Sequence, residues 1–142
     1  MFLVDVNVLL YAVNADAENH EKAHRWLSAA LVGPGDVVGL SWSVLLAFIR
    51  LSTHRAVFPA PLELGPALQV VEEWLHMPTT LIVEPTPRHL RLLGGLLQEL
   101  GVVGNLIPDA HLAALALEHR ATIVSFDHDF GRFRGVDWVI PE

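Results

Sequence analysis

Short, mainly apolar runs alternate with helical patterns along this chain, and that alternation limits its fold more than any other feature. The first run, Phe2-Leu3-Val4, shows no alternation of apolar and polar residues, which is typical of a central parallel strand buried on both faces. We therefore predict a single domain, residues 1–142, built as an α/β three-layer sandwich around a mainly parallel sheet of about five strands. The predicted strands lie within residues 2–4, 37–40, 80–83, 121–125 and 136–140.

Between these runs, apolar residues recur at the three- and four-residue spacing of half-buried helices. Leucines at 90, 93, 97 and 100 show this spacing, although Gly94-Gly95 weakens that helix by about 1 kcal/mol per glycine. Residues 101–104 are predicted to form a flexible connection. The predicted helices cover about residues 8–12, 19–31, 44–51, 63–76, 88–100 and 108–117.

The composition excludes several classes of protein. A net charge of −7 argues against a general nucleic-acid coat, which would carry a basic face, but it permits an acidic site that depends on a cation. The absence of cysteine rules out disulfides and thiolate metal sites. Although 52% of the residues are hydrophobic, no segment reaches the roughly 18 uninterrupted apolar residues of a membrane-spanning helix. The start also lacks a basic region and a cleavage site, so we expect a cytoplasmic protein without membrane contact.

Carboxylates recur just beyond the predicted strands. Asp5 follows the first strand, the Asp127/Asp129 pair follows the fourth, and Asp109 lies in the first turn of the helix that Pro108 begins. Because ligands of open α/β sheets bind at the carboxyl ends of the strands, these acids are predicted to converge at one edge. Each acid also has a structural interpretation: Asp5 caps a helix, Asp109 complements a helix dipole, and Asp127 caps a turn.

Carboxylates gathered this closely repel one another and raise one another's pKa unless a cation joins them. Mg²⁺ or Mn²⁺, which prefer carboxylate oxygens and retain several waters, would fit such a cluster. An ion of this kind can activate water and neutralise phosphate charge. The acids therefore predict metal-assisted hydrolysis of a phosphodiester.

The segments that carry these acids resemble those of a known family, the PIN-domain nucleases. The opening stretch, residues 5–12 (DVNVLLYA), resembles the first motif of the family. Residues 108–116 (PDAHLAALA) and 121–127 (ATIVSFD) resemble its closing motifs. The similarity is with the VapC toxins of bacterial toxin–antitoxin pairs, and it runs through nearly the whole chain in order. Trp42 and residues 48–53 (FIRLST) resemble the mycobacterial branch.

This resemblance implies a PIN-like fold and a Mg²⁺-dependent endoribonuclease that cuts structured RNA such as tRNA. It also implies a cognate VapB-type antitoxin that holds the enzyme inactive, and a homodimer. In that family the positions that match Asp5 and Asp109 bind the metal, and the position that matches Asp127 completes the acidic group. The candidate auxiliary residues are Asn7, Ser125 and Asp129.

One position departs from the family pattern. PIN nucleases carry an acid, usually Glu, on the helix after the second strand, and Ala47 occupies that place here. No Asp or Glu occurs from Val37 to Leu62, so shifting the match by one residue does not recover the acid. The protein either works with fewer acids, is a weakened natural nuclease, or carries an engineered substitution.

Two other interpretations stay open. The run His20-Glu21-Lys22-Ala23-His24 matches the H-E-x-x-H pattern of zinc proteases. Both histidines fall at the margin of an apolar helix face, toward solvent, and no third ligand identifies itself. The second alternative is a non-catalytic PIN fold that binds RNA or a partner without cutting, because the usual Glu is missing.

Basic residues near the predicted site are either ordinary surface bases or contacts for RNA phosphates along a path beside the acids. Three lie on or just after the helix with Ala47, and two follow the last acidic pair: Arg50, His54, Arg55, Arg132 and Arg134.

The apolar content also bears on association. A mean hydropathy of +0.42 predicts more large apolar side chains than one small domain hides. We therefore expect a homodimer and a further groove for an antitoxin segment. The alternative is that all of these side chains fit in the core: Leu9, Tyr11, Trp26, Trp42 and Trp74.

Overall fold

The computed structural model of the protein describes residues 1–101 and 104–142, and the predicted alternation of strands and helices is present in it. The predicted connection over residues 101–104 lies partly outside the described residues. All five strands fall within the predicted runs: β1 (Phe2–Val4), β2 (Val38–Leu40), β3 (Thr80–Ile82), β4 (Thr122–Val124) and β5 (Trp138–Val139).

The five strands form one sheet in the order β3-β2-β1-β4-β5, and every neighbouring pair is parallel. The central strand is β1, where Leu3 is aligned with Gly39 of β2 on one side and with Ile123 of β4 on the other. The predicted parallel sheet is therefore confirmed. Because all strands run in the same direction, their carboxyl ends meet at one edge, where Asp5 follows β1 and Ser125 follows β4.

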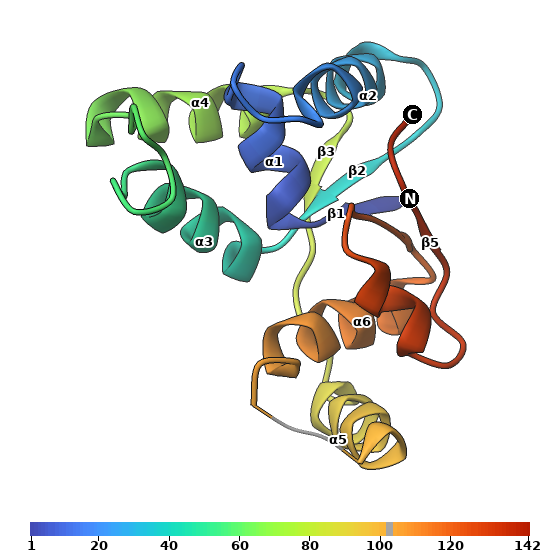
Figure 1. The fold of residues 1–142 in the computed structure, drawn as a ribbon. Coiled ribbons are helices and arrows are strands. Elements are labelled where there is room, and N and C mark those ends of the chain that lie inside the picture. The colour runs from blue at the N-terminus through green and yellow to red at the C-terminus, as the bar shows by residue number, and fades with distance from the viewer. Residues whose placement is uncertain (102–103) are drawn as a thin grey trace.

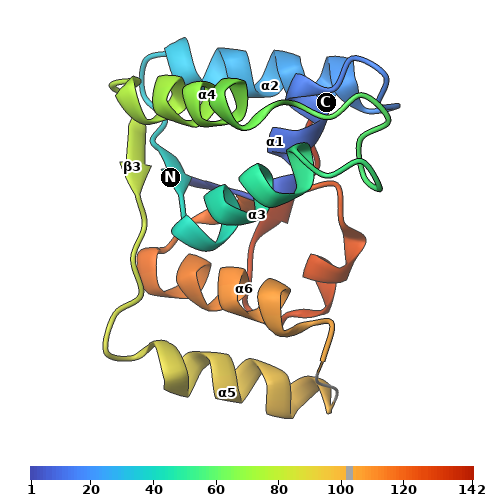
Figure 2. The same ribbon diagram turned by 90° about the vertical axis from the view of Figure 1, so that its left-hand side faces the viewer.

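Helices cover both faces of the sheet, which confirms the predicted three-layer arrangement (Figures 1 and 2). Helices α1–α4 lie on one side, whereas α6 lies on the other side with α5 outside it. A short 3-10 helix, η1 (His128–Arg132), follows β4. The helices are α1 (Val6–Val13), α2 (His20–Val32), α3 (Trp42–Ser52), α4 (Leu64–His76), α5 (His89–Leu100) and α6 (Ile107–His119).

The helices that border the strand ends begin at well-defined residues. Ser41 caps α3, because its hydroxyl accepts a hydrogen bond of 3.3 Å from the Val44 N–H. Helix α6 begins at Ile107, so Pro108 is its second residue and not the predicted first. Asp109 still lies in the first turn of α6, as predicted, because the helix start moves by only one position.

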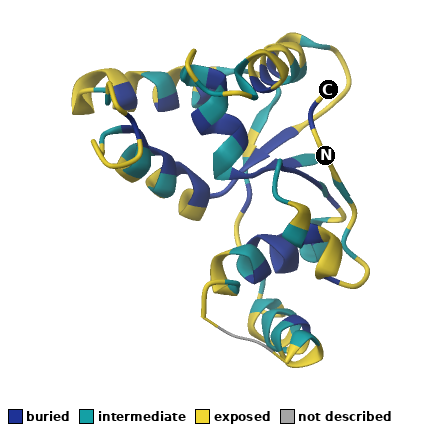
Figure 3. Cartoon of the chain, viewed as in Figure 1, coloured by how far each residue is buried: buried dark blue, intermediate teal, exposed yellow. Residues whose placement is uncertain are grey.

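The hydrophobic core is continuous from the sheet into both helical layers. Its largest fully buried side chains are Phe48 of α3 and Phe130 of η1, which lie on different segments that cover the sheet. Figure 3 shows the central strands and the inner side of α6 as buried, whereas the outer sides of α2 and α5 are exposed. Burial of this kind is the main stabilising contribution to the fold.

The predicted apolar surplus is wrong for two of its five residues. Leu9 is fully buried, because α1 lies between the sheet and other helices. Trp74 is 8% exposed and packs edge-on against Phe48, with 4.9 Å between ring centroids. Tyr11 and Trp26 are half-buried, which leaves only Trp42 of the five exposed. Among the helices within residues 1–101 and 104–142, none is long and apolar enough to cross a bilayer.

Candidate active site

Asp5 is held at the edge of the sheet by three hydrogen bonds. Its Oδ1 accepts a bond of 2.7 Å from the Val6 N–H, so Asp5 caps α1. Its Oδ2 accepts bonds of 2.6 Å from the Ser125 hydroxyl and 2.8 Å from the Asn7 amide. The residue is only 8% exposed. The capping interpretation of Asp5 is therefore correct, and the same side chain also belongs to the acidic cluster.

Asn7 and Ser125 join the end of β1 to the end of β4. The Asn7 amide donates to Ser125 Oγ at 3.0 Å, and Asn7 Oδ1 accepts a bond of 3.2 Å from the Phe126 N–H. Ser125 Oγ in turn accepts a bond of 2.9 Å from the Asp127 N–H. The predicted auxiliary residues Asn7 and Ser125 therefore fix the positions of Asp5 and Asp127 relative to each other.

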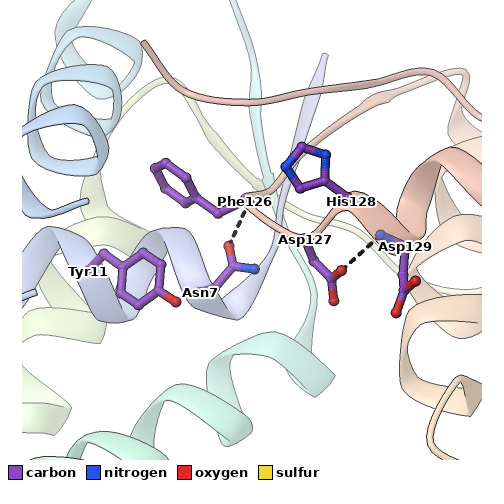
Figure 4. Close-up of a pocket in the computed structure, with 6 residues that line it drawn as sticks. All are labelled: Asn7, Tyr11, Phe126, Asp127, His128 and Asp129. Atoms are coloured by element: carbon purple, nitrogen blue, oxygen red, sulfur yellow. Dashed lines mark hydrogen bonds between the residues drawn. The ribbon is translucent and has the colours of Figure 1, made fainter. Parts of the chain in front are cut away.

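Asp127 and Asp129 lie on the segment that follows β4. Asp127 Oδ1 accepts a bond of 2.8 Å from the Asp129 N–H, so Asp127 caps η1 as well as joining the cluster. Figure 4 shows both carboxylates pointing to the same side, away from His128. They border an open cavity of about 410 Å³, lined by Asn7, Tyr11, Phe126, Asp127, His128 and Asp129.

Asp109 and Ala47 lie on two different helices and line the same cavity. A cavity of about 110 Å³ is lined by Asp5, by Asp109 of α6 and by Ala47 of α3. The helix after the second strand therefore borders the acidic cluster, as the sequence comparison with the family predicts. At this position the wall presents a methyl group where a carboxylate would face Asp5 and Asp109.

The pKa values report the crowding of these acids. Burial, followed by the charges of Asp5, Asp127 and Asp129, raises the pKa of Asp109 to about 6. Burial also raises the pKa of Asp5; hydrogen bonds from Ser125 and Val6 offset this in part, and the charge of Asp127 adds to it. Like charges and burial both disfavour the ionised forms, so this cluster is electrostatically unsatisfied without a cation.

The donor set suits a hard divalent cation, because it consists of carboxylate oxygens. Within residues 1–101 and 104–142, however, no three His, Asp or Glu side chains are gathered closely enough to enclose an ion by themselves. The chain would therefore supply only part of a coordination shell and leave the remainder to water and substrate, an arrangement that Mg²⁺ favours. A cation bound here would lower the raised pKa of Asp109, because it would favour the ionised carboxylate.

The structure separates the predicted basic residues. Arg50 lines a second cavity, of about 480 Å³, together with Ala47 and Pro108. His54 and Arg55 belong to the turn after α3 and line neither of the two cavities that contain Ala47.

The two later arginines have acidic partners. Arg132 approaches Asp129 at 3.6 Å, and Arg134 approaches Glu99 of α5 at 3.4 Å. Arg50 is therefore the predicted base that shares a cavity with Ala47, whereas Arg132 lies beside Asp129 of the acidic cluster.

The zinc-protease pattern lies on the outer part of α2. The buried face of that helix consists of Ala23, Leu27 and Leu31, whereas His24 and Glu21 are exposed. The Nδ1 of His20 lies 2.8 Å from the Tyr11 carbonyl oxygen, where it donates a hydrogen bond. No third ligand joins the two histidines among the described residues. The pattern is therefore a partly solvated helix edge, as its spacing predicted.

One polar cluster beside the site contains none of the residues predicted from the sequence. His89 of α5 bonds to Glu118 of α6 at 2.7 Å and to His111 of α6 at 2.8 Å. Burial lowers the pKa of His111, as does the charge of His89, whereas Glu118 acts in the opposite direction. The available signal was helical spacing: His111 and Glu118 are two turns apart on α6 and therefore share one face.

Comparison with known proteins relates the whole chain to one family. The model of the PIN domain family matches residues 2–136. Ribonuclease VapC37 of Mycobacterium tuberculosis is 52% identical over 141 residues, which cover 99% of this chain and 97% of that protein. Ribonuclease VapC25 of the same species is 42% identical over 143 residues, which cover 99% of both chains.

Solved structures share the fold at much lower identity. A chain of the VapBC2 structure from Rickettsia felis, bound to a DNA fragment from their promoter, has a TM-score of 0.71 at 17% identity and covers 99% of this chain and 98% of its own. Mycobacterium tuberculosis VapC20, described as a sarcin-ricin loop cleaving toxin, has a TM-score of 0.66 at 18% identity, with 92% and 93% covered. At these identities the likeness concerns the fold alone.

Proposed function

We propose, on the premise that this chain belongs to the PIN-domain family and within it to the VapC ribonucleases, that it is the endoribonuclease toxin of a toxin–antitoxin pair. The observation that carries the proposal is the cavity that Asp5, Asp109 and position 47 share at the carboxyl edge of the sheet. Asp127 is near enough for its charge to raise the pKa of both acids. An acidic cleft of this kind suits phosphodiester hydrolysis assisted by a divalent cation.

In this proposal Asp5 and Asp109 hold Mg²⁺ or Mn²⁺, and Asp127 completes the acidic group. The bound cation would neutralise phosphate charge and make a water molecule more acidic. Asn7 and Ser125 orient Asp5 through bonds to its Oδ2, so that this carboxylate keeps one position. Asp129 acts indirectly, because its N–H bonds Asp127 Oδ1 and restricts that carboxylate.

The substrate in this proposal is structured RNA, such as tRNA. Arg50 would contact a phosphate of the strand that passes the acids, because it lines the cavity next to Ala47. His54 and Arg55 are weaker candidates, since they lie farther along the chain in the turn beyond α3. Mycobacterium tuberculosis VapC20, described as a sarcin-ricin loop cleaving toxin, supports the same substrate class.

The partner in this proposal is a VapB-type antitoxin, and the toxin forms a homodimer. Related structures are complexes of VapB with VapC proteins, which supports the first part. Exposed apolar side chains on the two helices that border the acids support a docking surface: Trp42 and Leu46 of α3 are 47% and 59% exposed, and Ile107 of α6 is 45% exposed.

Ala47 determines the cation affinity that we expect of the enzyme. A carboxylate on α3 would face the same cavity as Asp5 and Asp109, so its absence removes either a ligand or a contact to a bound water. Losing one such group commonly lowers metal affinity or activity by about 10- to 100-fold. We therefore propose a nuclease with reduced cation affinity.

The test is cleavage of total RNA by the purified, antitoxin-free protein in Mg²⁺, in Mn²⁺ and in EDTA, with the new termini mapped. Cleavage at defined sites that EDTA abolishes is the expected result. Binding of RNA without cleavage at any cation concentration would instead favour the non-catalytic PIN fold. The methyl group at position 47 is the observation that favours this second function.

A further inference from the structure

A chain of hydrogen bonds connects three titratable side chains between α5 and α6, beside the cluster of aspartates. Glu118 Oε2 lies 2.7 Å from His89 Nδ1, and His89 Nε2 lies 2.8 Å from His111 Nδ1. The Glu118 side chain is fully buried, and its Oε1 accepts bonds from both the N–H and the hydroxyl of Thr86. Burial raises the pKa of Glu118, but the hydrogen bonds from Thr86 and His89 outweigh it and lower the pKa below its usual value.

An ionised Glu118 fixes the direction of this chain of bonds. A carboxylate only accepts hydrogen bonds, so His89 Nδ1 carries a proton and donates it to Glu118. If the His89 ring holds only this one proton, its Nε2 is the acceptor and the Nδ1–H of His111 is the donor. His111 is thereby held in the form whose Nε2 has no proton. Its remaining polar atom is a hydrogen-bond acceptor.

The His111 side chain lines an open space. His111 lines the cavity of about 480 Å³ that also contains Ala47, Arg50 and Pro108. Within the described residues, Nε2 bonds to no protein group and is not among the buried polar atoms without partners. Nε2 is therefore open to solvent, on a side chain that lines this cavity.

Holding the two helices together does not require this last ring. The bonds from Glu118 to His89 and Thr86 already join α6 to α5 and to the segment before it. An apolar side chain at position 111 would pack at the same helix face without exposing an acceptor. The network therefore does more than join the two helices. It also determines which nitrogen of His111 carries the proton where this side chain lines the cavity.

The cavity has the chemistry of a nucleotide subsite. Its volume lies within the range of about 300–1,000 Å³ that is usual for small-ligand sites. Leu46, Ile107 and Pro108 give it an apolar wall against which a base or ribose can pack, and Arg50 supplies a cation for a phosphate. An acceptor such as His111 Nε2 matches the 2′-hydroxyl, the group by which proteins distinguish RNA from DNA.

We propose that this cavity is a ribonucleotide subsite in which His111 Nε2 accepts a hydrogen bond from a 2′-hydroxyl, while His89 and Glu118 are positioning residues that fix the His111 ring. The proposal rests on the proposed function, because it places the RNA strand next to Ala47 and the acids. It assigns to α6 both the phosphate chemistry, through Asp109, and the recognition of ribose, two residues later.

The first experiment measures binding in EDTA, so that cleavage does not interfere. Fluorescence anisotropy compares labelled oligouridylate with oligodeoxyuridylate for the parent, for His111→Phe and for the control His24→Phe on the exposed side of α2. One hydrogen bond contributes about 0.5–1.5 kcal/mol, which corresponds to a ribose preference of about 2- to 10-fold. We expect the parent and His24→Phe to show this preference and His111→Phe to lose it. An unchanged preference in His111→Phe, or no preference in the parent, overturns the proposal and leaves the cavity to a protein partner.

The second experiment reverses the chain of bonds without removing a ring. In Glu118→Gln the amide oxygen remains the acceptor for Thr86, so the amide N–H group faces His89 Nδ1. His89 then donates from Nε2, and His111 carries its proton on Nε2. Nitrogen NMR of the histidine rings should show His111 protonated at Nδ1 in the parent and at Nε2 in the variant. A proton on Nε2 in the parent overturns the proposal.

The experiments distinguish failure of the proposed subsite from failure of the proposed nuclease. RNA cleavage without a ribose preference that depends on His111 would leave the nuclease assignment standing and remove only the subsite. A ribose preference that His111→Phe abolishes, in a protein that cuts no RNA with any cation, would keep the subsite and remove the nuclease. Binding to neither oligonucleotide would remove the subsite.

Discussion

The acidic site has two halves that are built in different ways. The strand half consists of Asp5, Asn7, Ser125 and Asp127 at the ends of β1 and β4, where each side chain takes part in a hydrogen bond. The helix half consists of Ala47, Arg50 and Asp109 on α3 and α6. There the Asp109 carboxylate accepts no hydrogen bond from any residue within 1–101 and 104–142, and position 47 has only a methyl group.

The two halves therefore differ in how much each contributes to the stability of the fold and to the chemistry of the site. The carboxylates of the strand half already accept hydrogen bonds, so these acids stabilise the fold as helix caps and as links between β1 and β4 as well as forming the site. In the helix half, burial and the charges of Asp5, Asp127 and Asp129 raise the pKa of Asp109. A bound cation would therefore change the helix half more than the strand half.

The largest effect is expected from removing one acid in each half. Asp5→Ala and Asp109→Ala should each lower RNA cleavage by about 100-fold or more, since each removes a proposed ligand of the cation. Their effects on stability should differ. Asp5→Ala removes a helix cap and leaves donors without their acceptor, and so should lower the free energy of unfolding by about 2 kcal/mol. Asp109→Ala should leave it unchanged or raise it.

Urea unfolding in EDTA, with cleavage assays on the same preparations, measures both quantities. If urea unfolds Asp109→Ala as readily as Asp5→Ala, the two halves contribute equally to the stability of the fold. Full activity in either variant would remove that acid from the site.

Restoring an acid to the helix half should produce the next largest effect. Ala47→Glu is expected to raise cation affinity or cleavage by about 10- to 100-fold, because the new carboxylate would enter the cavity of Asp5 and Asp109. Ala47→Gln is the matched control, with nearly the same shape and no charge. The measurement is cleavage against Mg²⁺ concentration, beside a melting curve for each protein. Equal cation dependence for the Glu and Gln variants would place the missing acid elsewhere.

The pH dependence of stability should follow Asp109. Its folded pKa of about 6 exceeds its ordinary value of 3.8, so the folded state binds this proton more tightly than the unfolded chain. The resulting stability is fully present below about pH 4 and is lost as the pH rises through about 6. Asp109 is half-buried and screened by solvent, so the effect should be on the order of 1 kcal/mol.

Melting curves in EDTA from pH 4.5 to 7 test this expectation. The decline should be smaller in Asp109→Asn, which has no proton to release, and smaller in the parent when Mg²⁺ is present. An identical decline in parent and variant would assign it to another group, with Asp5 as the first candidate because its pKa is also raised.

The smallest effect should come from the cations around the helix half. Arg50→Ala is expected to weaken RNA binding a few-fold and to reduce the slope of log affinity against log salt by about 1, as the loss of one phosphate contact does. Arg134→Ala is the control, because Arg134 lies beside Glu99 of α5. Anisotropy titrations at several salt concentrations measure both variants. Equal losses for the two would indicate a general charge effect without a local contact.

Most elements of the fold were predictable from local patterns in the sequence. The five strands, the six helices and the acids beyond β1 and β4 lie where hydrophobic spacing predicted them, because each pattern depends on residues that are close in the chain. The parallel direction of the strands also followed from the alternation of strands and helices, because neighbouring parallel strands need a crossover connection, usually a helix. Position 47, where the resemblance predicts an acid, lines a cavity with Asp5 and Asp109.

The remaining features depend on contacts between distant segments, and only the tertiary structure decided them. Asn7 meets Ser125 across 118 positions of the chain, and His89 meets Glu118 between two helices. Neither pair has a local signal, because each residue alone resembles a surface polar group. Packing also placed Leu9 and Trp74 in the core and Arg50, but not His54 or Arg55, beside Ala47. The sequence by itself therefore determined the elements and the acids at the sheet edge, whereas their hydrogen-bond partners depend on side-chain directions that exist only once the layers have packed.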